Sequence, residues 1–421
     1  MREGELPRRV LIVGANYWPE ESGNAPYTTG LAEDLAAHGV QVTVLCAMPH
    51  YPQWRIRDGY RRRVRARETR GGVRLLRAWL WVPARQSAVQ RALFEGSFFL
   101  SALSSALGMR GVGHPDGVIG VTPSLSGAAL ARVIAKRRGV PYGVIVQDLV
   151  GPGAMQSGMT GGRRVARLVR AAEKWALSGA TGVAVVSKSF EPYLRTLGVA
   201  ESRITHTPNW SHISRSHADP LEVRQSFGLP AGSVVLHAGA MGLKQGLEQV
   251  VDAARLDAEH GGSLHFVLAG DGSQRELLQE RARGLENVIF LPQQSAERYA
   301  DLLVAADVLL ISERPGMVDM SLPGKLTSYV SAGRPIVAAV AAGGATADEV
   351  QGSGTGVVTP AGDPAELVSV LKKVSSSGGT RASSDEVVRT YERSLHRDTC
   401  LERLRQFVGA LDDDVPGADL P

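Results

Sequence analysis

The stretch SVVLHAGAMGLKQGLEQVVDAARLDAEHGGSLHFVLAGDG, residues 233–272, decides the fold. It begins with a short apolar run, turns through glycines, continues with helical periodicity, and ends in a second apolar run followed by Gly270-Asp271-Gly272. Short apolar runs of this kind are typical of buried parallel strands. The stretch therefore predicts a strand–helix–strand unit with a glycine turn at the carboxyl end of each strand.

The same alternation extends to both sides of this unit. Further strands are predicted at residues 9–13, 40–46, 116–121, 142–147, 182–186, 288–291, 308–311 and 335–340. The pattern breaks at residues 206–230, which are typical of a linker. We therefore expect an α/β protein with two Rossmann-like, doubly wound domains that face a central cleft, where the strand ends place the ligand sites.

The expected domains are residues 1–205 and 206–385. Residues 386–411 are predicted to form a helix that packs back toward the N-terminal domain, and residues 412–421 an acidic, disordered tail. With 43% hydrophobic and 21% charged residues, the chain of 421 residues has the composition of a soluble protein.

The sequence has no apolar run of about 18 residues, and its first nine residues are polar and charged. We therefore expect a cytoplasmic protein without a transmembrane helix. Cys46 and Cys400 match no metal-ligand spacing and are interpreted as two unpaired thiols in a reducing compartment.

The region from Arg55 to Leu107 is unusually basic. It has twelve arginines and two acids up to Arg91, with tryptophans and a tyrosine among them, and a Phe-rich and Leu-rich run follows. Three interpretations are open: a solvated face or core helix, docking to anionic lipid headgroups, and nucleic-acid binding. The last is disfavoured because no nucleic-acid module is recognisable.

Neither predicted domain has a dinucleotide-binding fingerprint. The first strand continues into Gly14-Ala15-Asn16 instead of G-x-G-x-x-G, and the chain has no Walker A sequence. A nicotinamide dehydrogenase is therefore disfavoured. Glycine-rich turns nevertheless stand where a phosphate would bind.

Four such turns are candidates for a phosphate site, because small residues let a ligand approach the backbone and helix N-termini favour anions. An ordinary turn or helix start is the alternative for each. Their residues are Gly23 and Asn24 in the first, Gly242 with Lys244 in the second, Gly270, Asp271 and Gly272 in the third, and Ser321, Pro323, Gly324 and Lys325 in the fourth.

Taken together and in this order, these segments resemble the family-4 retaining glycosyltransferases of GT-B fold, and most of all the colanic-acid and O-antigen type. The residues that carry the resemblance are NYWPEESGNAPYTTG at 16–30, VQDL at 146–149, PNW at 208–210, GAMGLKQGLE at 239–248, LAGDG at 268–272 and PGKLTSYVSAGRPIVA at 323–338. The similarity spans roughly residues 9–371.

The resemblance implies that residues 1–205 bind the acceptor and residues 206–385 bind a nucleoside diphosphate sugar as co-substrate. It implies sugar transfer with retention and without a metal or other cofactor. Lys244, Lys325 and helix N-termini would neutralise the leaving diphosphate, whose oxygen can take the acceptor proton. Gln293 is expected beside the nucleotide base.

This chain departs from the wider family at the Glu-x7-Glu pair. The two positions fall on Met320, beside Asp319, and on Ser328, so neither glutamate is present. The colanic-acid type also tends to lack the pair, so activity is still expected. The loss leaves open how Ser328 or Asp319 compensates at the donor ribose and sugar.

Three residues of the N-terminal half are candidates for acceptor binding. Asp148 follows a strand, near the position where the family often has a catalytic His, and is a candidate general base or acceptor-orienting group. A turn cap is the alternative. His50 and Tyr51 follow the second strand, and acceptor contact and packing are both open for them.

The leading interpretation is a hexosyltransferase that acts on a polyprenyl-linked or other surface-glycan intermediate, on the inner leaflet of a membrane. A transferase of a soluble small molecule such as an antibiotic would have the same fold. A non-catalytic nucleotide-sugar-binding partner protein is also open, and a sugar-nucleotide epimerase is a minor fourth interpretation.

Overall fold

The computed structural model describes residues 6–83, 88–107, 112–151, 162–211, 213, 215–316, 324–376 and 385–412. The chain divides into two compact units, one made of Met1–Asn209 with Asp398–Pro421 and the other of Trp210–Arg397. Each unit is built on one sheet, as the sequence predicted. The domain limits expected at 205/206 and 385/386 stay predictions.

The first unit has an eight-stranded sheet with the order β3-β4-β2-β1-β5-β6-β7-β8. All neighbouring strands are parallel except β3, which runs antiparallel to β4. The strands are β1 (Arg9–Val13), β2 (Gln41–Ala47), β3 (Arg65–Arg70), β4 (Val73–Ala78), β5 (Gly117–Val121), β6 (Tyr142–Val146), β7 (Gly182–Val185) and β8 (Ile204–His206). The central strands are apolar and buried on both faces, as expected of a parallel sheet between helices.

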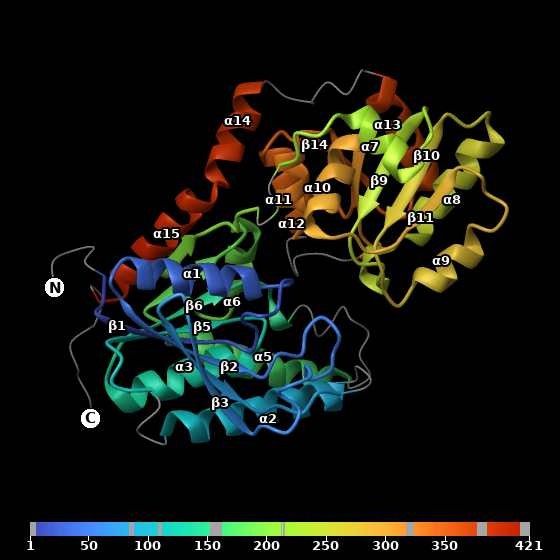
Figure 1. Ribbon diagram of the computed structural model, residues 1–421. Helices are drawn as coiled ribbons and strands as arrows, with labels where there is room; N and C mark the ends of the chain where they lie inside the picture. The colour runs from blue at the N-terminus through green and yellow to red at the C-terminus, as the bar shows by residue number, and fades with distance from the viewer. Residues whose placement is uncertain are drawn as a thin grey trace. The chain divides into compact units, whose positions relative to one another are not determined.

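Helices cover both faces of this sheet (Figure 1). One face carries α2 (Ala88–Leu107), α3 (Leu125–Arg138) and α5 (Gly162–Ser178), and the other carries α1 (Ala25–Ala37) and α15 (Arg397–Gly409). The short helix α6 (Glu191–Thr196) precedes β8. Helices on both faces place the loops after β1, β2, β5 and β6 at one edge of the sheet.

The arginine-rich segment contains a hairpin that the sequence pattern did not predict. Strands β3 and β4 are joined by Gly71 and Gly72, both at positive φ, as a two-residue hairpin turn requires. Arg77 of β4 is buried; its guanidinium pairs with Glu68 at 2.8 Å and donates to the Trp18 carbonyl at 2.5 Å. One arginine of the basic run is therefore part of the core.

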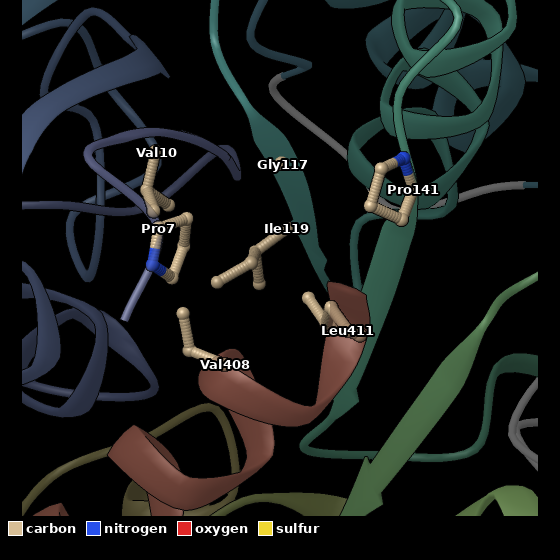
Figure 2. Close-up of a pocket in the computed structure, with 7 residues that line it drawn as sticks. All are labelled: Pro7, Val10, Gly117, Ile119, Pro141, Val408 and Leu411. Atoms are coloured by element: carbon tan, nitrogen blue, oxygen red, sulfur yellow. The ribbon is translucent and has the colours of Figure 1, made fainter. Parts of the chain in front are cut away.

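The C-terminal helix α15 packs on the first sheet where β6 and β7 have glycines. A Cβ atom at Gly143 would lie 2.8 Å from the Phe407 ring, and one at Gly182 would lie 2.9 Å from it. Figure 2 shows Val408 and Leu411 facing side chains from the sheet, including Val10 and Ile119. The space between them has no room for a water molecule, so this is a packed apolar seam.

The second unit has a six-stranded parallel sheet with the order β11-β10-β9-β12-β13-β14. Its strands are β9 (Ser233–Ala238), β10 (Leu264–Ala269), β11 (Val288–Leu291), β12 (Val308–Ser312), β13 (Ile336–Val340) and β14 (Gly356–Pro360). The order reverses between β9 and β12. The carboxyl ends of these two strands are therefore the place where a doubly wound sheet binds its ligand.

Alternate residues of these strands build two separate cores. Val234 and Leu236 of β9 belong to one core, and Val235 belongs to the other. The first core also contains helices α7 (Pro220–Phe227), α10 (Ala296–Ala305), α11 (Lys325–Ala332) and α12 (Ala345–Gly352); the second contains α8 (Glu248–Glu259), α9 (Arg275–Arg281) and α13 (Pro364–Ser376). Helix α11 thus lies beside β9 with its N-terminus at the strand ends.

The helix expected over residues 386–411 is two helices in the structure, α14 (Asp385–Ser394) and α15. The break falls at Leu395 and His396, close to the division between the two units at Arg397. Because the two helices pack in different units, one straight helix would not serve both. In the part of the chain that the structure describes, none of the helices combines the length and apolar character needed to cross a bilayer.

Candidate functional site

Two glycine turns meet at the carboxyl ends of β9 and β10. Gly270 and Gly272 have φ angles of 140° and 155°, and a Cβ atom would lie 1.9 Å from the Gly239 carbonyl oxygen at the first and 2.5 Å from that of Met241 at the second. The Met241 amide donates to the Asp271 carbonyl at 2.8 Å. No side chain fits at either glycine, so the two turns form one rigid shelf.

The shelf is fixed to the end of β12 through the turn at residues 243–245. The Gly242 amide donates to Gln245 Oε1 at 3.0 Å, and Ser312 Oγ donates to the Gln245 carbonyl at 2.8 Å. The Arg314 amide donates to the Lys244 carbonyl at 2.9 Å. Lys244 is thereby held close to Glu313, and its charge lowers the pKa of that carboxyl.

Lys325, the first residue of α11, lies over the same shelf. Its Nζ is 3.1 Å from His237 Nε2 and would lie 3.4 Å from a Cβ atom at Gly239. Burial lowers the pKa of Lys325 to about 7, although the nearby carboxylate of Glu313 opposes the shift. The structure therefore brings together Lys244, Lys325 and Gly242, which the sequence placed in two separate turns.

Two residues of this cluster were missed by the sequence analysis. His237 is fully buried, and burial together with the Lys325 charge lowers its pKa well below the ordinary value. Glu313 accepts from Thr346 Oγ1 at 2.7 Å, and burial raises its pKa. The available signal was a polar residue at the end of each apolar strand, His237 in SVVLHA and Glu313 directly after VLLIS.

The remaining donor candidates are less closely placed. Asp271 is exposed, and its carboxylate accepts from the Gly272 amide at 2.8 Å, while Gln293 is exposed after β11. Ser328 is buried on α11. Gly324 is exposed at the N-cap of α11, whereas Ser321 and Pro323, with Asp319 and Met320, lie outside the described residues.

The acceptor candidates gather in the first unit, at the carboxyl ends of β1, β2, β5 and β6. The Asn24 amide donates to the Thr122 carbonyl at 3.1 Å, and Thr122 Oγ1 donates to the Asp148 carbonyl at the same distance. The Tyr51 ring would lie 3.2 Å from a Cβ atom at Gly23. Burial and the charges of Asp148 and Glu20 raise the pKa of Tyr51, which places these side chains near one another.

Glu20 organises this group and was not singled out from the sequence. Its carboxylate is buried and accepts from the backbone amides of His50 at 2.7 Å and Tyr51 at 2.8 Å, and from the Asn16 side chain at 2.8 Å. The His50 ring is 3% exposed and packs against Phe94. Packing thus describes His50 in this structure, and acceptor contact stays a prediction for it and for Tyr51.

The loop after Asp148 is held by Glu173 of α5. This buried carboxylate accepts from the amides of Val150 at 2.9 Å and Gly151 at 3.1 Å, and from the Tyr193 hydroxyl at 2.6 Å. Burial raises the pKa of Glu173 in spite of these donors. Across the described residues, no three His, Cys, Asp or Glu side chains stand close enough to hold a metal ion.

Comparisons with known proteins place both units. Residues 22–210 match the glycosyl transferase 4-like domain, and residues 232–377 match the glycosyl transferases group 1. A putative colanic acid biosynthesis glycosyl transferase, WcaI of Escherichia coli (strain K12), is 34% identical over 77% of this chain and 81% of its own length. The 2-deoxystreptamine glucosyltransferase of Streptomyces kanamyceticus is 31% identical over 62% of this chain and 66% of its own.

Solved structures agree on the fold. The crystal structure of Anabaena HepE in complex with UDP and glucose has a TM-score of 0.66 at 14% identity and covers 94% of this chain and 98% of that one. WaaG, a glycosyltransferase involved in lipopolysaccharide biosynthesis, has a TM-score of 0.66 at 15% identity, with 95% and 99% covered. The GT-B fold predicted from the sequence is confirmed.

Proposed function

Because the chain belongs to the family-4, or group 1, glycosyltransferases, we propose that it transfers a hexose from a nucleoside diphosphate sugar to a lipid-linked intermediate of a surface polysaccharide. The transfer retains the anomeric configuration and uses no metal. The observation that carries this proposal is the 34% identity to the colanic acid glycosyltransferase over 77% of the chain.

The cluster at the ends of β9, β10 and β12 is proposed as the donor diphosphate site. Lys325 and Lys244 supply positive charge beside backbone amides of a glycine turn, which is the chemistry that a leaving diphosphate needs. UDP and glucose bound in the Anabaena structure support a donor of this class. Asp271, Gln293, Ser328 and Gly324 are the candidates for further contacts with the donor.

In the first unit, Asp148 is proposed to orient the acceptor hydroxyl. It stands partly exposed beyond β6, near Tyr51, while Glu173 holds the backbone of the following residues. In a front-face transfer, the bond between the anomeric carbon and the leaving oxygen breaks as the acceptor oxygen bonds to the same face. The acceptor proton then passes to the leaving phosphate oxygen, so no protein nucleophile is needed.

A lipid-linked acceptor requires access to a membrane, and a surface of the first unit fits that need. On α2, the side chains of Val89, Leu93 and Leu100 are 67%, 55% and 68% exposed, and their spacing places them on one face. Arg65 of β3 reaches this helix, since its guanidinium donates to Ser104 Oγ at 2.9 Å. We name these three apolar residues, with the exposed arginines 61, 62, 63 and 65, the α2–β3 surface.

An apolar face beside arginines is suited to an anionic leaflet, because arginines draw it to the headgroups and apolar side chains enter the interface. We propose that the α2–β3 surface docks the enzyme peripherally on the inner leaflet. Of the three interpretations of this basic segment, lipid docking best uses the exposed apolar stripe on α2.

A soluble aminocyclitol acceptor is the second candidate. The 31% identity to 2-deoxystreptamine glucosyltransferase favours it, and an alpha-D-kanosaminyltransferase of the same organism is 24% identical over 67% of the chain. A transferase of this kind would need no membrane surface. The two candidates therefore differ in whether the purified enzyme binds anionic vesicles.

The donor proposal is tested by a thermal-shift panel of UDP, GDP, TDP, ADP and CMP on the wild type and on Lys325→Ala. A ligand at about 100 times its Kd stabilises the folded state by roughly 2.7 kcal/mol, which is a visible shift. We expect one nucleoside diphosphate to stabilise the wild type and not the variant. No shift with any nucleotide would contradict the donor site and favour a non-catalytic partner protein.

A further inference from the structure

His237 has a position that the proposed reaction does not by itself explain. It is a fully buried imidazole in β9, and its Nε2 lies 3.1 Å from the Lys325 ammonium nitrogen. The ring is also close to the carbonyl oxygen of Ala240, at 3.4 Å, and to the backbone of Leu310. These backbone contacts fix the ring plane, so it presents a lone pair toward Lys325 when one nitrogen donates to a carbonyl.

A neutral imidazole is an unusual partner for a lysine. It accepts one hydrogen bond and orients the ammonium, but it brings no negative charge. The charged groups that bear on Lys325 are therefore few: His237 from β9 and Glu313 from the end of β12. Glu313 also faces Lys244 and accepts from Thr346. One carboxylate thus serves two lysines, and the cluster lacks one negative charge when both are protonated.

From this geometry we propose that His237 is the positioning residue for Lys325, and that a nucleoside diphosphate group bound here drives the uptake of one proton by Lys325. The inference rests on the proposed donor site. In the unliganded protein, His237 keeps the amine pointed at the Gly239 turn without supplying a counter-ion. The incoming diphosphate supplies the missing negative charge, and the amine then takes a proton from the solvent.

The energetics agree in direction. Burial lowers the pKa of Lys325 to about 7, so near neutral pH about half of the unliganded molecules lack the proton. A diphosphate within hydrogen-bond reach favours the ammonium form and raises the pKa again. Affinity for the donor should therefore weaken as the pH rises above about 7, by up to tenfold for each pH unit while the bound state keeps its proton.

The probe for the test is UDP-glucose, because its diphosphate has no free terminal phosphate that titrates near neutral pH. Calorimetric titration at about pH 7.5, in two buffers that differ in ionisation enthalpy, measures the protons taken up on binding. We expect net uptake for the wild type. Lys325→Arg stays charged, so it should bind without uptake, and its affinity should be nearly constant between about pH 6 and 9.

His237→Phe keeps the ring volume and removes the acceptor; we expect about tenfold weaker binding. His237→Gln restores an acceptor and should recover most of the affinity, which a purely structural role would not predict. His265→Phe is the matched control, since His265 lies on the neighbouring strand beside Gly232, at the other end of the sheet.

Wild-type binding without proton uptake would overturn the proton-linked half of the proposal, and wild-type affinity in His237→Phe would overturn the positioning half. Failure of the wild type to bind UDP-glucose, GDP-mannose or TDP-glucose would instead remove the donor site on which both halves rest.

Discussion

At the scale of single residues, the cluster holds a lysine at a cost to stability. The pKa of Lys325 is about 7 in the folded protein, below its ordinary value of 10.5. The unfolded chain therefore binds more protons between these values, and the stability of the folded protein rises with pH through that window. Below pH 7, the full cost of burying the ammonium opposes folding. A residue kept in spite of such a cost is a mark of a functional site.

Lys325→Met should accordingly stabilise the unliganded protein while it removes nucleotide binding. The gain in melting temperature should be largest near about pH 6.5, where the native lysine is charged, and smaller near about pH 9.5, where it is mostly neutral. Thermal melts of both proteins at these two values check the prediction. Lys136→Met, at an exposed position at the end of α3, is the control and should show no such trend. A gain that does not change with pH would contradict the assigned shift.

Glu20 makes the opposite contribution, since three donors converge on its buried carboxylate. Glu20→Ala leaves the amides of His50 and Tyr51 without their acceptor and should lower the free energy of unfolding by about 3 kcal/mol. Glu20→Gln retains one oxygen and should lose about 1 kcal/mol. Urea unfolding measures both, and Glu21→Ala, at the exposed neighbouring position, should behave as the wild type. Equal midpoints for Glu20→Ala and the wild type would show that the loop does not depend on this carboxylate.

At the scale of elements, helix α15 depends on the absence of side chains in the strands beneath it. A methyl group at Gly143 would press on the Phe407 ring at 2.8 Å, whereas one at Gly117 would meet no atom within 4 Å. Gly143→Ala should therefore destabilise the first unit by about 1–3 kcal/mol through overpacking, while Gly117→Ala is neutral or slightly stabilising. Urea unfolding of the two variants compares them directly. Comparable losses at both sites would mean that the seam in Figure 2 tolerates displacement of the helix.

The elements also show what the sequence could and could not predict. The apolar strands were found to within a residue or so, because burial on both faces leaves an unbroken apolar run, as in β9 and β10. The hairpin β3–β4 was missed because alternating arginines hide its pattern, and a buried Arg77 is stabilised by tertiary partners alone. Glycine turns marked the candidate site, but Glu20, His237 and Glu313 became visible only when distant segments were brought together.

At the scale of the whole molecule, the acceptor determines whether the enzyme needs a membrane. Replacing Arg62, Arg63 and Arg65 of the α2–β3 surface by glutamine should weaken binding to anionic vesicles by roughly 100-fold, at about 1 kcal/mol for each arginine. Leu93→Ser with Leu100→Ser should also weaken binding, because it removes exposed apolar area from α2. Co-sedimentation with vesicles, with and without an anionic lipid, measures both effects.

The matched control is Lys136, Arg137 and Arg138 at the end of α3, which remove the same charge when all three are changed to glutamine. If this control loses as much binding as the α2–β3 variant, attraction is a matter of net charge and the surface has no special role. If the wild type does not sediment with anionic vesicles at low salt, where electrostatic attraction is strongest, the lipid-linked acceptor loses its support. The aminocyclitol acceptor then becomes the stronger candidate, because a soluble acceptor reaches the same fold without any docking surface.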